Sequence, residues 1–107
     1  MPKYLWRARY TAQGTRGLVN AGGSKRRRAV EAALRTVGGT LEAFYFALGD
    51  VDVYIIADVP DNVSIAAASL VINAAGAVAV NTTVLLSAQE LDQAAKQYKH
   101  LAYRPPH

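Results

Sequence analysis

The sequence predicts an α+β domain with one four-stranded antiparallel sheet, and three observations support this prediction. Aromatic and β-branched runs with an alternating pattern predict strands over 3–10 and 77–86 and a hairpin over 40–59. Between them, 24–37 and 63–75 have the apolar spacing of helices. A Ser-x-x-Glu capping signal starts one more helix near the C-terminus. Strand, helix, hairpin, helix, strand is the ferredoxin-like βαββαβ order, here with an added C-terminal helix.

The length and composition fit one domain. With 107 residues and 51% hydrophobic content, the chain is long enough to bury a core. Ser and Asn interrupt its apolar runs before they reach the roughly 20 residues that span a bilayer. The N-terminus does not resemble a signal peptide. We therefore expect a cytoplasmic protein without membrane contact, with one domain over 1–98 and an extended or disordered tail over 99–107.

The residue types limit the possible chemistry. The chain has no cysteine, so it has no disulfide and no thiolate metal site. His100 and His107 lie in the tail, where Asp92 is the nearest acidic residue, and this spacing predicts no metal site within one chain. No Walker, Rossmann or Gly-x-Ser-x-Gly motif is present, which disfavours the common nucleotide enzymes. We expect no metal and no cofactor.

The first strand, over 3–10, is apolar on one side and basic on the other. Its alternate positions are Tyr4, Trp6, Ala8 and Tyr10 on the apolar side, and Leu5, Arg7 and Arg9 on the basic side. Gly14 and Gly17 follow within 11–21, and each destabilises a helix by about 1 kcal/mol relative to Ala. We therefore expect only a short or frayed helix there, ended by the Gly22-Gly23 pair.

The helix over 24–37 begins with Ser24, a good N-cap, and ends at Gly38 or Gly39. Its predicted buried stripe is Ala29, Val30, Ala33, Leu34 and Val37. The helix over 63–75 has no charged residue and ends at Gly76. Such a helix is expected to be covered on more than one side, which indicates an oligomer.

The last helix runs from the capping box of Ser87 and Glu90 to about Tyr98. Leu91, Ala94 and Ala95 continue an apolar stripe that ends at Tyr98.

Gly49 and Asp50 predict a two-residue turn at the centre of the hairpin. This turn pairs Leu48 with Val51, Phe46 with Val53, Tyr45 with Tyr54, Phe44 with Ile55 and Leu41 with Asp58. Directly opposed residues share a face. The predicted core face is Phe44, Phe46, Leu48, Val51, Val53, Ile55 and Val59. The other face is mixed, and Gly49 is expected to have a positive φ angle.

The mixed face of the sheet is the first candidate site. An unpaired buried charge is costly, so the arginines of the first strand are expected on this uncovered face. The candidate residues are Arg7, Arg9, Tyr45, Asp52, Tyr54 and Asp58. Three interpretations stay open: an interface ion-pair network, a bound small anion, and acid–base catalysis. An exposed face with these aromatic residues indicates a homodimer or a higher oligomer.

The basic start of the second predicted helix is the other candidate site. Ser24, Lys25, Arg26, Arg27 and Arg28 are suited to bind an anion, since positive charge there opposes the helix dipole and does not stabilise the helix. The alternative is a solvated face that Glu31 partly balances. Nucleic acid is disfavoured because no aromatic residues are interleaved with the cations.

Several stretches resemble the GYD domain family of small bacterial proteins. They are Pro2-Lys3-Tyr4, Gly22-Gly23-Ser24, GGTLEAFYFALGDVDV, IIADVPDN, and Ala-Gly-Ala-Val before TTVLLS, and together they cover about residues 2 to 97. The resemblance implies a ferredoxin-like chain of the dimeric α/β barrel type. In the motif that names the family, Gly49 and Asp52 are retained, while Val51 stands where an aromatic residue is expected.

These features favour a homo-oligomeric small-ligand-binding or structural protein that uses the open sheet face. The alternative is a cofactor-independent enzyme of the isomerase, lyase or oxygenase type with a pocket on that face, and this alternative is supported by fold analogy. A pocket lined by Asp52 and Tyr54 in the oligomer distinguishes the two.

Overall fold

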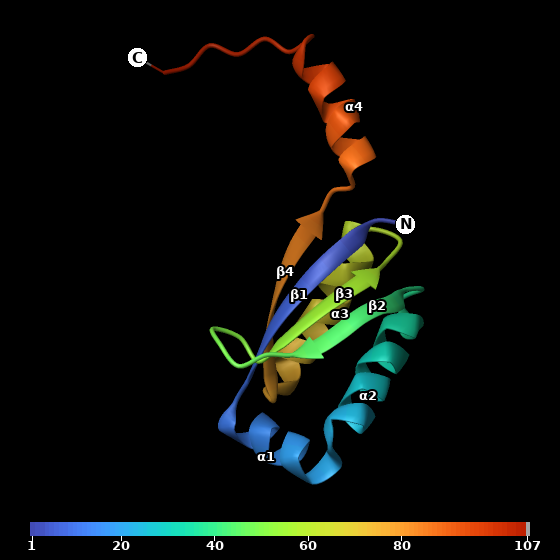
Figure 1. Ribbon diagram of the computed structural model, residues 1–107, viewed down its shortest axis with the longest axis vertical. Helices are drawn as coiled ribbons and strands as arrows, with labels where there is room; N and C mark the ends of the chain where they lie inside the picture. Colours follow the sequence, from blue (N-terminus) through green and yellow to red (C-terminus); the bar gives the residue numbers. More distant parts are fainter. Residues whose placement is uncertain (107) are drawn as a thin grey trace.

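The computed structural model describes residues 1–106 and has an α+β ferredoxin-like fold with an extra C-terminal helix, as predicted (Figure 1). Its elements are β1 (Lys3–Tyr10), α1 (Ala12–Ala21), α2 (Gly23–Thr36), β2 (Thr40–Phe46), β3 (Val53–Asp58), α3 (Asn62–Ala75), β4 (Val78–Leu85) and α4 (Ala88–Tyr98). The strands form one antiparallel sheet in the order β2-β3-β1-β4. α3 lies behind the sheet in Figure 1, and α2 lies beside it.

One face of the sheet forms the core with α2 and α3. The core includes Trp6 of β1 and Ile55 of β3, with Val30 and Leu34 from α2 and Ile65 from α3. Two polar side chains of β1 at this face have partners within the chain. The Trp6 indole N–H donates to Thr82 Oγ1 (2.9 Å) and Ser69 Oγ (3.2 Å), and the Tyr4 hydroxyl donates to Asn62 Oδ1 (2.6 Å). The polar groups of Tyr4 and Trp6 are therefore satisfied by their own chain.

α1 is more regular than expected, a ten-residue helix in place of a short or frayed one. Thr11 caps it, since the Thr11 hydroxyl accepts from the Gly14 backbone N–H (3.1 Å). The Thr11 backbone N–H also donates to the Ala77 carbonyl at the start of β4 (3.0 Å). A side chain at Gly14 would overlap that same carbonyl. Close packing against β4 therefore explains this glycine and offsets its helix penalty.

α2 begins differently from the prediction. Its N-cap is Gly22, with a φ of 87° and no side-chain cap, so the N-cap assignment for Ser24 is wrong. The positive φ of Gly22 turns the chain from α1 into α2 within one residue, which only glycine does easily. Of the predicted stripe, Val30 and Leu34 are buried, whereas Ala29 is exposed.

The hairpin keeps part of the predicted register. Phe46 pairs with Val53, Tyr45 with Tyr54 and Phe44 with Ile55, as expected. A bulge between Leu41 and Ala43 then shifts the pairing, so that Leu41 faces Ala57 and Thr40 faces Asp58. The predicted pair of Leu41 and Asp58 is therefore wrong, because one extra residue lies in β2.

The connection between β2 and β3 is a loop over 47–52 and not a two-residue turn. Within it the Ala47 backbone N–H donates to the Asp52 carbonyl (2.8 Å). Leu48 is fully exposed and Val51 is buried, so the predicted Leu48–Val51 pair is wrong. Gly49 does not have a positive φ, which also differs from the prediction. Asp52 explains the longer loop, because its backbone N–H donates to the Ala8 carbonyl (2.9 Å).

α4 extends beyond the end of β4 and away from the sheet (Figure 1). The predicted capping box is confirmed: Ser87 and Glu90 each accept from the other's backbone N–H. No α4 residue is buried, and Leu91 and Tyr98 of the predicted stripe are 61% and 76% exposed. Within residues 1–106, no helix has the length and apolarity needed to cross a membrane.

Candidate functional site

The uncovered face of the sheet brings together three of the predicted site residues. The register places Arg7 of β1 opposite Tyr54 of β3, and Tyr54 opposite Tyr45 of β2. Directly opposed residues share a face, so these three side chains form one row across three strands. Tyr45 is 71% exposed and Tyr54 is 40% exposed. This row is a continuous aromatic and cationic surface that the chain's own helices do not cover.

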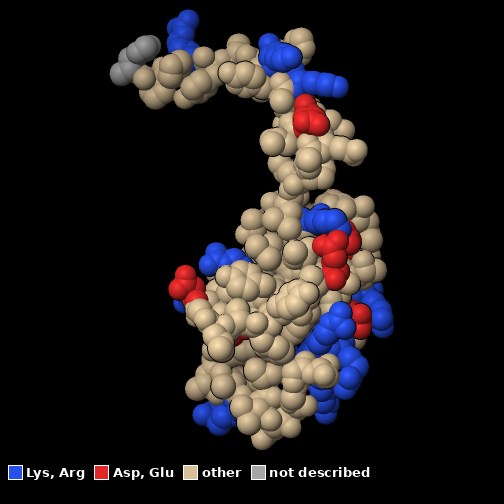
Figure 2. Space-filling model, in the orientation of Figure 1, with Lys and Arg blue, Asp and Glu red and all other residues tan. Residues whose placement is uncertain are grey.

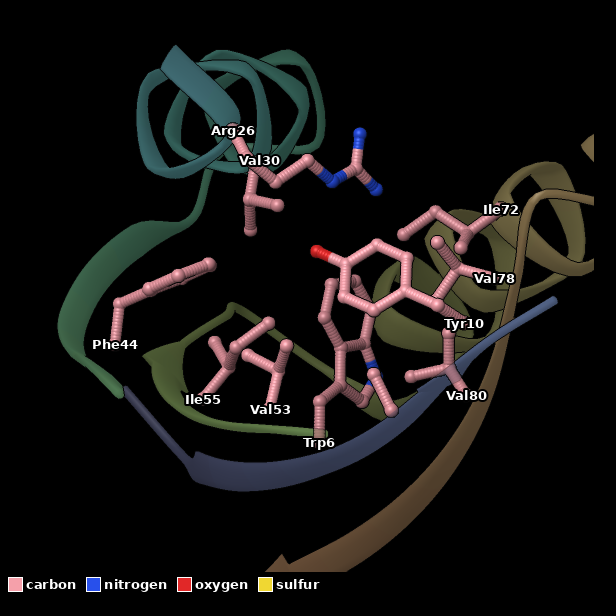
Figure 3. Close-up of a pocket in the computed structure, with 11 residues that line it drawn as sticks. Trp6, Tyr10, Arg26, Val30, Phe44, Val53, Ile55, Ile72, Val78 and Val80 are labelled. Carbon is pink, nitrogen blue, oxygen red and sulfur yellow. The ribbon is translucent and has the colours of Figure 1, made fainter. Parts of the chain in front are cut away.

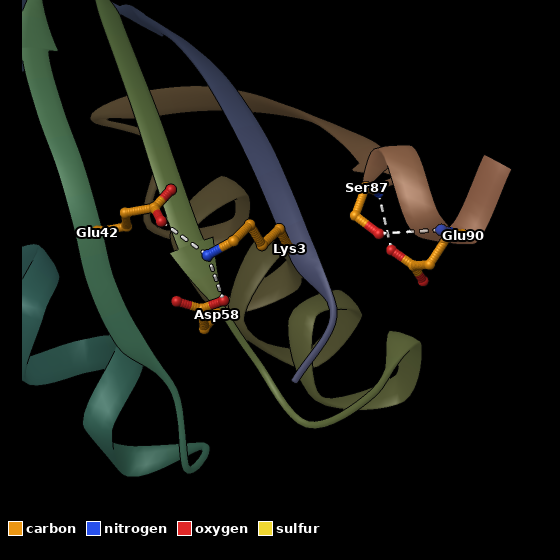
Figure 4. A network of polar contacts seen from close by, with 5 residues as sticks. All are labelled: Lys3, Glu42, Asp58, Ser87 and Glu90. Carbon is orange, nitrogen blue, oxygen red and sulfur yellow. Dashed lines mark hydrogen bonds and ion pairs between the residues drawn. The ribbon is translucent and has the colours of Figure 1, made fainter. Parts of the chain in front are cut away.

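Asp58 has a different partner from the one expected. Its Oδ1 lies 2.9 Å from Lys3 Nζ, and Lys3 Nζ also lies 2.7 Å from Glu42 Oε1 (Figure 4). The hydrogen bond to Glu42, followed by the one to Asp58, raises the pKa of Lys3. The sequence reasoning missed Lys3 and Glu42. The register of β1 against β3 was the available signal for Lys3, whereas the bulge in β2 concealed Glu42.

The charges of this face are separated along the strands. Glu42 and Asp58 lie beside Lys3 at the start of β1, and Arg7 and Arg9 lie toward its end. Among residues 1–106, neither arginine forms an ion pair. One end of the face is therefore acidic and the other end is basic.

A hollow of about 430 Å³ adjoins the acidic end of the face. It lies between the sheet and the first turn of α4, and its lining includes Lys3, Glu42, Ile56, Leu85 and Glu90. Figure 4 shows Glu90 capping α4 on the far side of β1 from Glu42. The backbone N–H of Ser87 donates to the Glu90 carboxylate and lowers its pKa. Glu90 thus adds a third carboxylate to this end.

Asp52 does not lie with the arginines in an ion pair. Its Oδ2 accepts from the Tyr10 backbone N–H (2.8 Å), and its own backbone N–H donates to Ala8. Both bonds tie the loop over 47–52 across the end of β1. Gly49 lies in the same loop, and nothing is within 4 Å of the place where a Cβ would be.

The sequence profile of the GYD domain matches residues 4–95. The chain belongs to the GYD domain family. In this GYD domain the loop over 49–52 places Val51, 2% exposed, in the core, while Asp52 binds backbone groups. Among curated proteins, no sequence matches this GYD domain significantly.

The basic run at the start of α2 divides into two parts. Ser24, Lys25, Arg27 and Arg28 are exposed, and cations gather over this part of the surface in Figure 2. Glu31 lies 3.8 Å from Arg35, one turn further along the helix. Arg26 is half-buried instead, and its guanidinium lies 6.0 Å from the centre of the Tyr10 ring (Figure 3). Periodicity alone did not single out Arg26 from its neighbours.

Within the described part of the chain, no cluster of three acidic or histidine side chains is arranged to hold a metal.

Proposed function

We propose that this GYD domain functions as a homodimeric binding protein in which the open sheet faces of two copies pack together. The observation that carries the proposal is the uncovered face itself. Tyr45 and Tyr54 are exposed on it, and Leu5 and Ile56 are only half-buried. Exposed aromatic and aliphatic surface of this kind favours burial against a partner. A second copy of the same surface forms a closed two-fold interface.

The charge separation supports a particular arrangement of the two copies. A two-fold axis that lies between the faces and runs across the strands places the start of each β1 opposite the end of the other. The basic end, with Arg7 and Arg9, then meets the acidic end, with Glu42 and Asp58, twice. Complementary charges of this kind fix the register of an interface more than its affinity. The arrangement supplies the arginines with the acidic partners that residues 1–106 of their own chain do not provide.

The row of Arg7, Tyr54 and Tyr45 also supports a ligand between the two faces. A guanidinium binds carboxylate or phosphate oxygens through paired N–H donors, and tyrosine hydroxyls add further donors. We therefore propose that the dimer holds a small anion at this row. A small anion that raises the melting temperature of the wild type but not of Arg7→Met would support this part of the proposal. If no anion raises the melting temperature of the wild type, the interface has a structural role only.

Sedimentation velocity tests the assembly. The wild type is expected to sediment as a dimer at micromolar concentration, and Ile56→Lys as a monomer, because a charged side chain would replace apolar surface that the interface buries. Val19→Lys is the matched control, since Val19 is exposed on α1 and is not on the open face. A monomeric wild type, or an Ile56→Lys variant that remains dimeric, would contradict the proposed interface.

A further inference from the structure

A second site lies on the helix-covered side of the sheet, where Arg26 turns inward. The Arg26 guanidinium lies over the Tyr10 ring, and its Nε atom is buried without an acceptor among residues 1–106. Within those residues Arg26 also has no carboxylate partner. A buried donor without an acceptor destabilises a folded chain, so its presence calls for an explanation.

Two spaces meet at Arg26. One is a small cavity of about 20 Å³ under α2 and α3, lined by core side chains such as Trp6 and Ile72 (Figure 3). The other is a groove of about 400 Å³ between α1 and α2. Tyr10, Arg26 and Val78 line both spaces and therefore separate them. The groove falls within the roughly 300–1,000 Å³ of typical small-molecule sites.

The groove has apolar walls and only positive charge. Its small and aliphatic lining residues are Gly14, Gly17, Leu18, Ala21, Ala29, Ala77 and Val78. Its charged lining residues are Lys25 and Arg26, and no acidic residue is among those that line it. At Gly17 the space is open, because a Cβ there would meet nothing within 4 Å. The surface therefore fits a molecule with an apolar body and one anionic end.

We propose that the groove between α1 and α2 binds a small amphipathic carboxylate. Its apolar body lies along α1 against Leu18 and Ala21, and its carboxylate accepts from Arg26 and Lys25. The planar guanidinium presents paired donors that match the two carboxylate oxygens. This site goes beyond the proposed dimer, since α1 and α2 do not lie on the open sheet face.

Isothermal titration tests the proposal with decanoate, below its micelle concentration, as the probe. Decanol has the same chain without the charge, and inorganic phosphate has charge without the chain. The wild type is expected to bind decanoate at least about tenfold more tightly than either, because only decanoate satisfies both the apolar walls and the cations. If decanoate does not bind, or if phosphate binds as tightly, the amphipathic site is overturned.

Three variants locate the site. Arg26→Met removes the inward cation and is expected to raise the decanoate Kd about tenfold. Arg28→Met removes an exposed cation from the same helix. Arg28 does not line the groove, so this variant is expected to change Kd less than about twofold. Gly17→Leu adds a larger side chain at a position that lines the groove and where an added Cβ would meet nothing within 4 Å. It also replaces a helix-weakening residue, so the variant is expected to stay folded and lose binding.

Equal weakening by Arg26→Met and Arg28→Met would show attraction to the charged surface alone and would overturn the site. Retained binding by Gly17→Leu would do the same, and this variant decides if Arg26→Met fails to fold. Sedimentation of the same variants separates this proposal from the dimer. Arg26→Met and Gly17→Leu are expected to lose decanoate binding and to remain dimeric. A wild type that is monomeric and still binds decanoate would contradict only the proposed assembly.

Discussion

The two faces of the sheet differ in how completely the chain satisfies them. On the covered face the Trp6 indole N–H has two hydroxyl partners, and Trp6 is 2% exposed. On the open face Tyr45 and Tyr54 remain exposed, and Arg7 has no ion-pair partner within residues 1–106. The comparison teaches that the apolar core packs on one side of the four strands and the proposed dimer surface lies on the other. Alternate residues of β1 therefore have different roles.

Substitution of one aromatic residue on each face is expected to give the largest difference. Trp6→Ala is expected to lower the free energy of unfolding by about 3–5 kcal/mol, because it leaves a cavity in the core. Tyr54→Ala is expected to change it by about 0.5 kcal/mol or less in the monomer. Urea denaturation at a low and a high protein concentration checks this. The Trp6→Ala loss is expected at both concentrations, and a Tyr54→Ala loss only where dimer forms. A Tyr54→Ala loss that is the same at both concentrations would contradict the comparison.

Asp52 tests where the boundary between the two roles lies. Asp52→Ala is expected to lower the free energy of unfolding by about 1–3 kcal/mol, because the Tyr10 backbone N–H loses its acceptor. Asp52→Asn keeps a side-chain oxygen and is expected to lose less. Both variants are expected to keep the wild-type oligomeric state, measured by sedimentation. If Asp52→Asn dissociates the dimer and leaves stability unchanged, then Asp52 belongs to the interface and not to the loop.

Much of the fold was predictable because its signals are local. The capping box at Ser87, the left-handed glycine at Gly76 and the strand alternation in β1 depend on residues close in sequence. The bulge in β2 and the acceptor role of Asp52 were not predictable, because they depend on backbone groups of other strands. For the same reason, Gly49 looked like a turn glycine although its φ is not positive.

The candidate sites were predictable in part. Alternation placed Arg7, Tyr45 and Tyr54 on one face, as the structure shows. The inward turn of Arg26 was not predictable, because its neighbours in the basic run have the same chemistry. Only the position of Tyr10, at the end of a distant strand, distinguishes it.

The smallest expected effect concerns acid pH and α4, which lies apart from both faces. The bond from the Ser87 backbone N–H lowers the pKa of Glu90 in the folded chain. The stabilisation of α4 by the ionised Glu90 carboxylate is therefore complete above the pKa of Glu90 in the unfolded chain. It is lost as pH falls through the lower pKa of Glu90 in the folded chain. Far-UV circular dichroism is expected to show a loss of helix in this acidic range, smaller in Glu90→Gln, which has no charge to lose. If Glu90→Gln loses as much helix as the wild type, the loss comes from another carboxylate. Asp61 is one example, because the bond from the Ser64 backbone N–H lowers its pKa.

The bond between Thr11 and the Ala77 carbonyl has a consequence for the order of folding. The two residues lie 66 positions apart, and α1 packs against β4 through Gly14 at the same point. A short helix with two glycines is marginal alone, so the bond to Ala77 adds to the stability of α1 only once that residue is in place. β1 likewise lies between β3 and β4, and one of its edges stays unpaired until the last strand arrives. During synthesis this edge of β1 therefore stays open until residue 85 has emerged, and pairing between strands so distant in sequence is of the kind that slows folding.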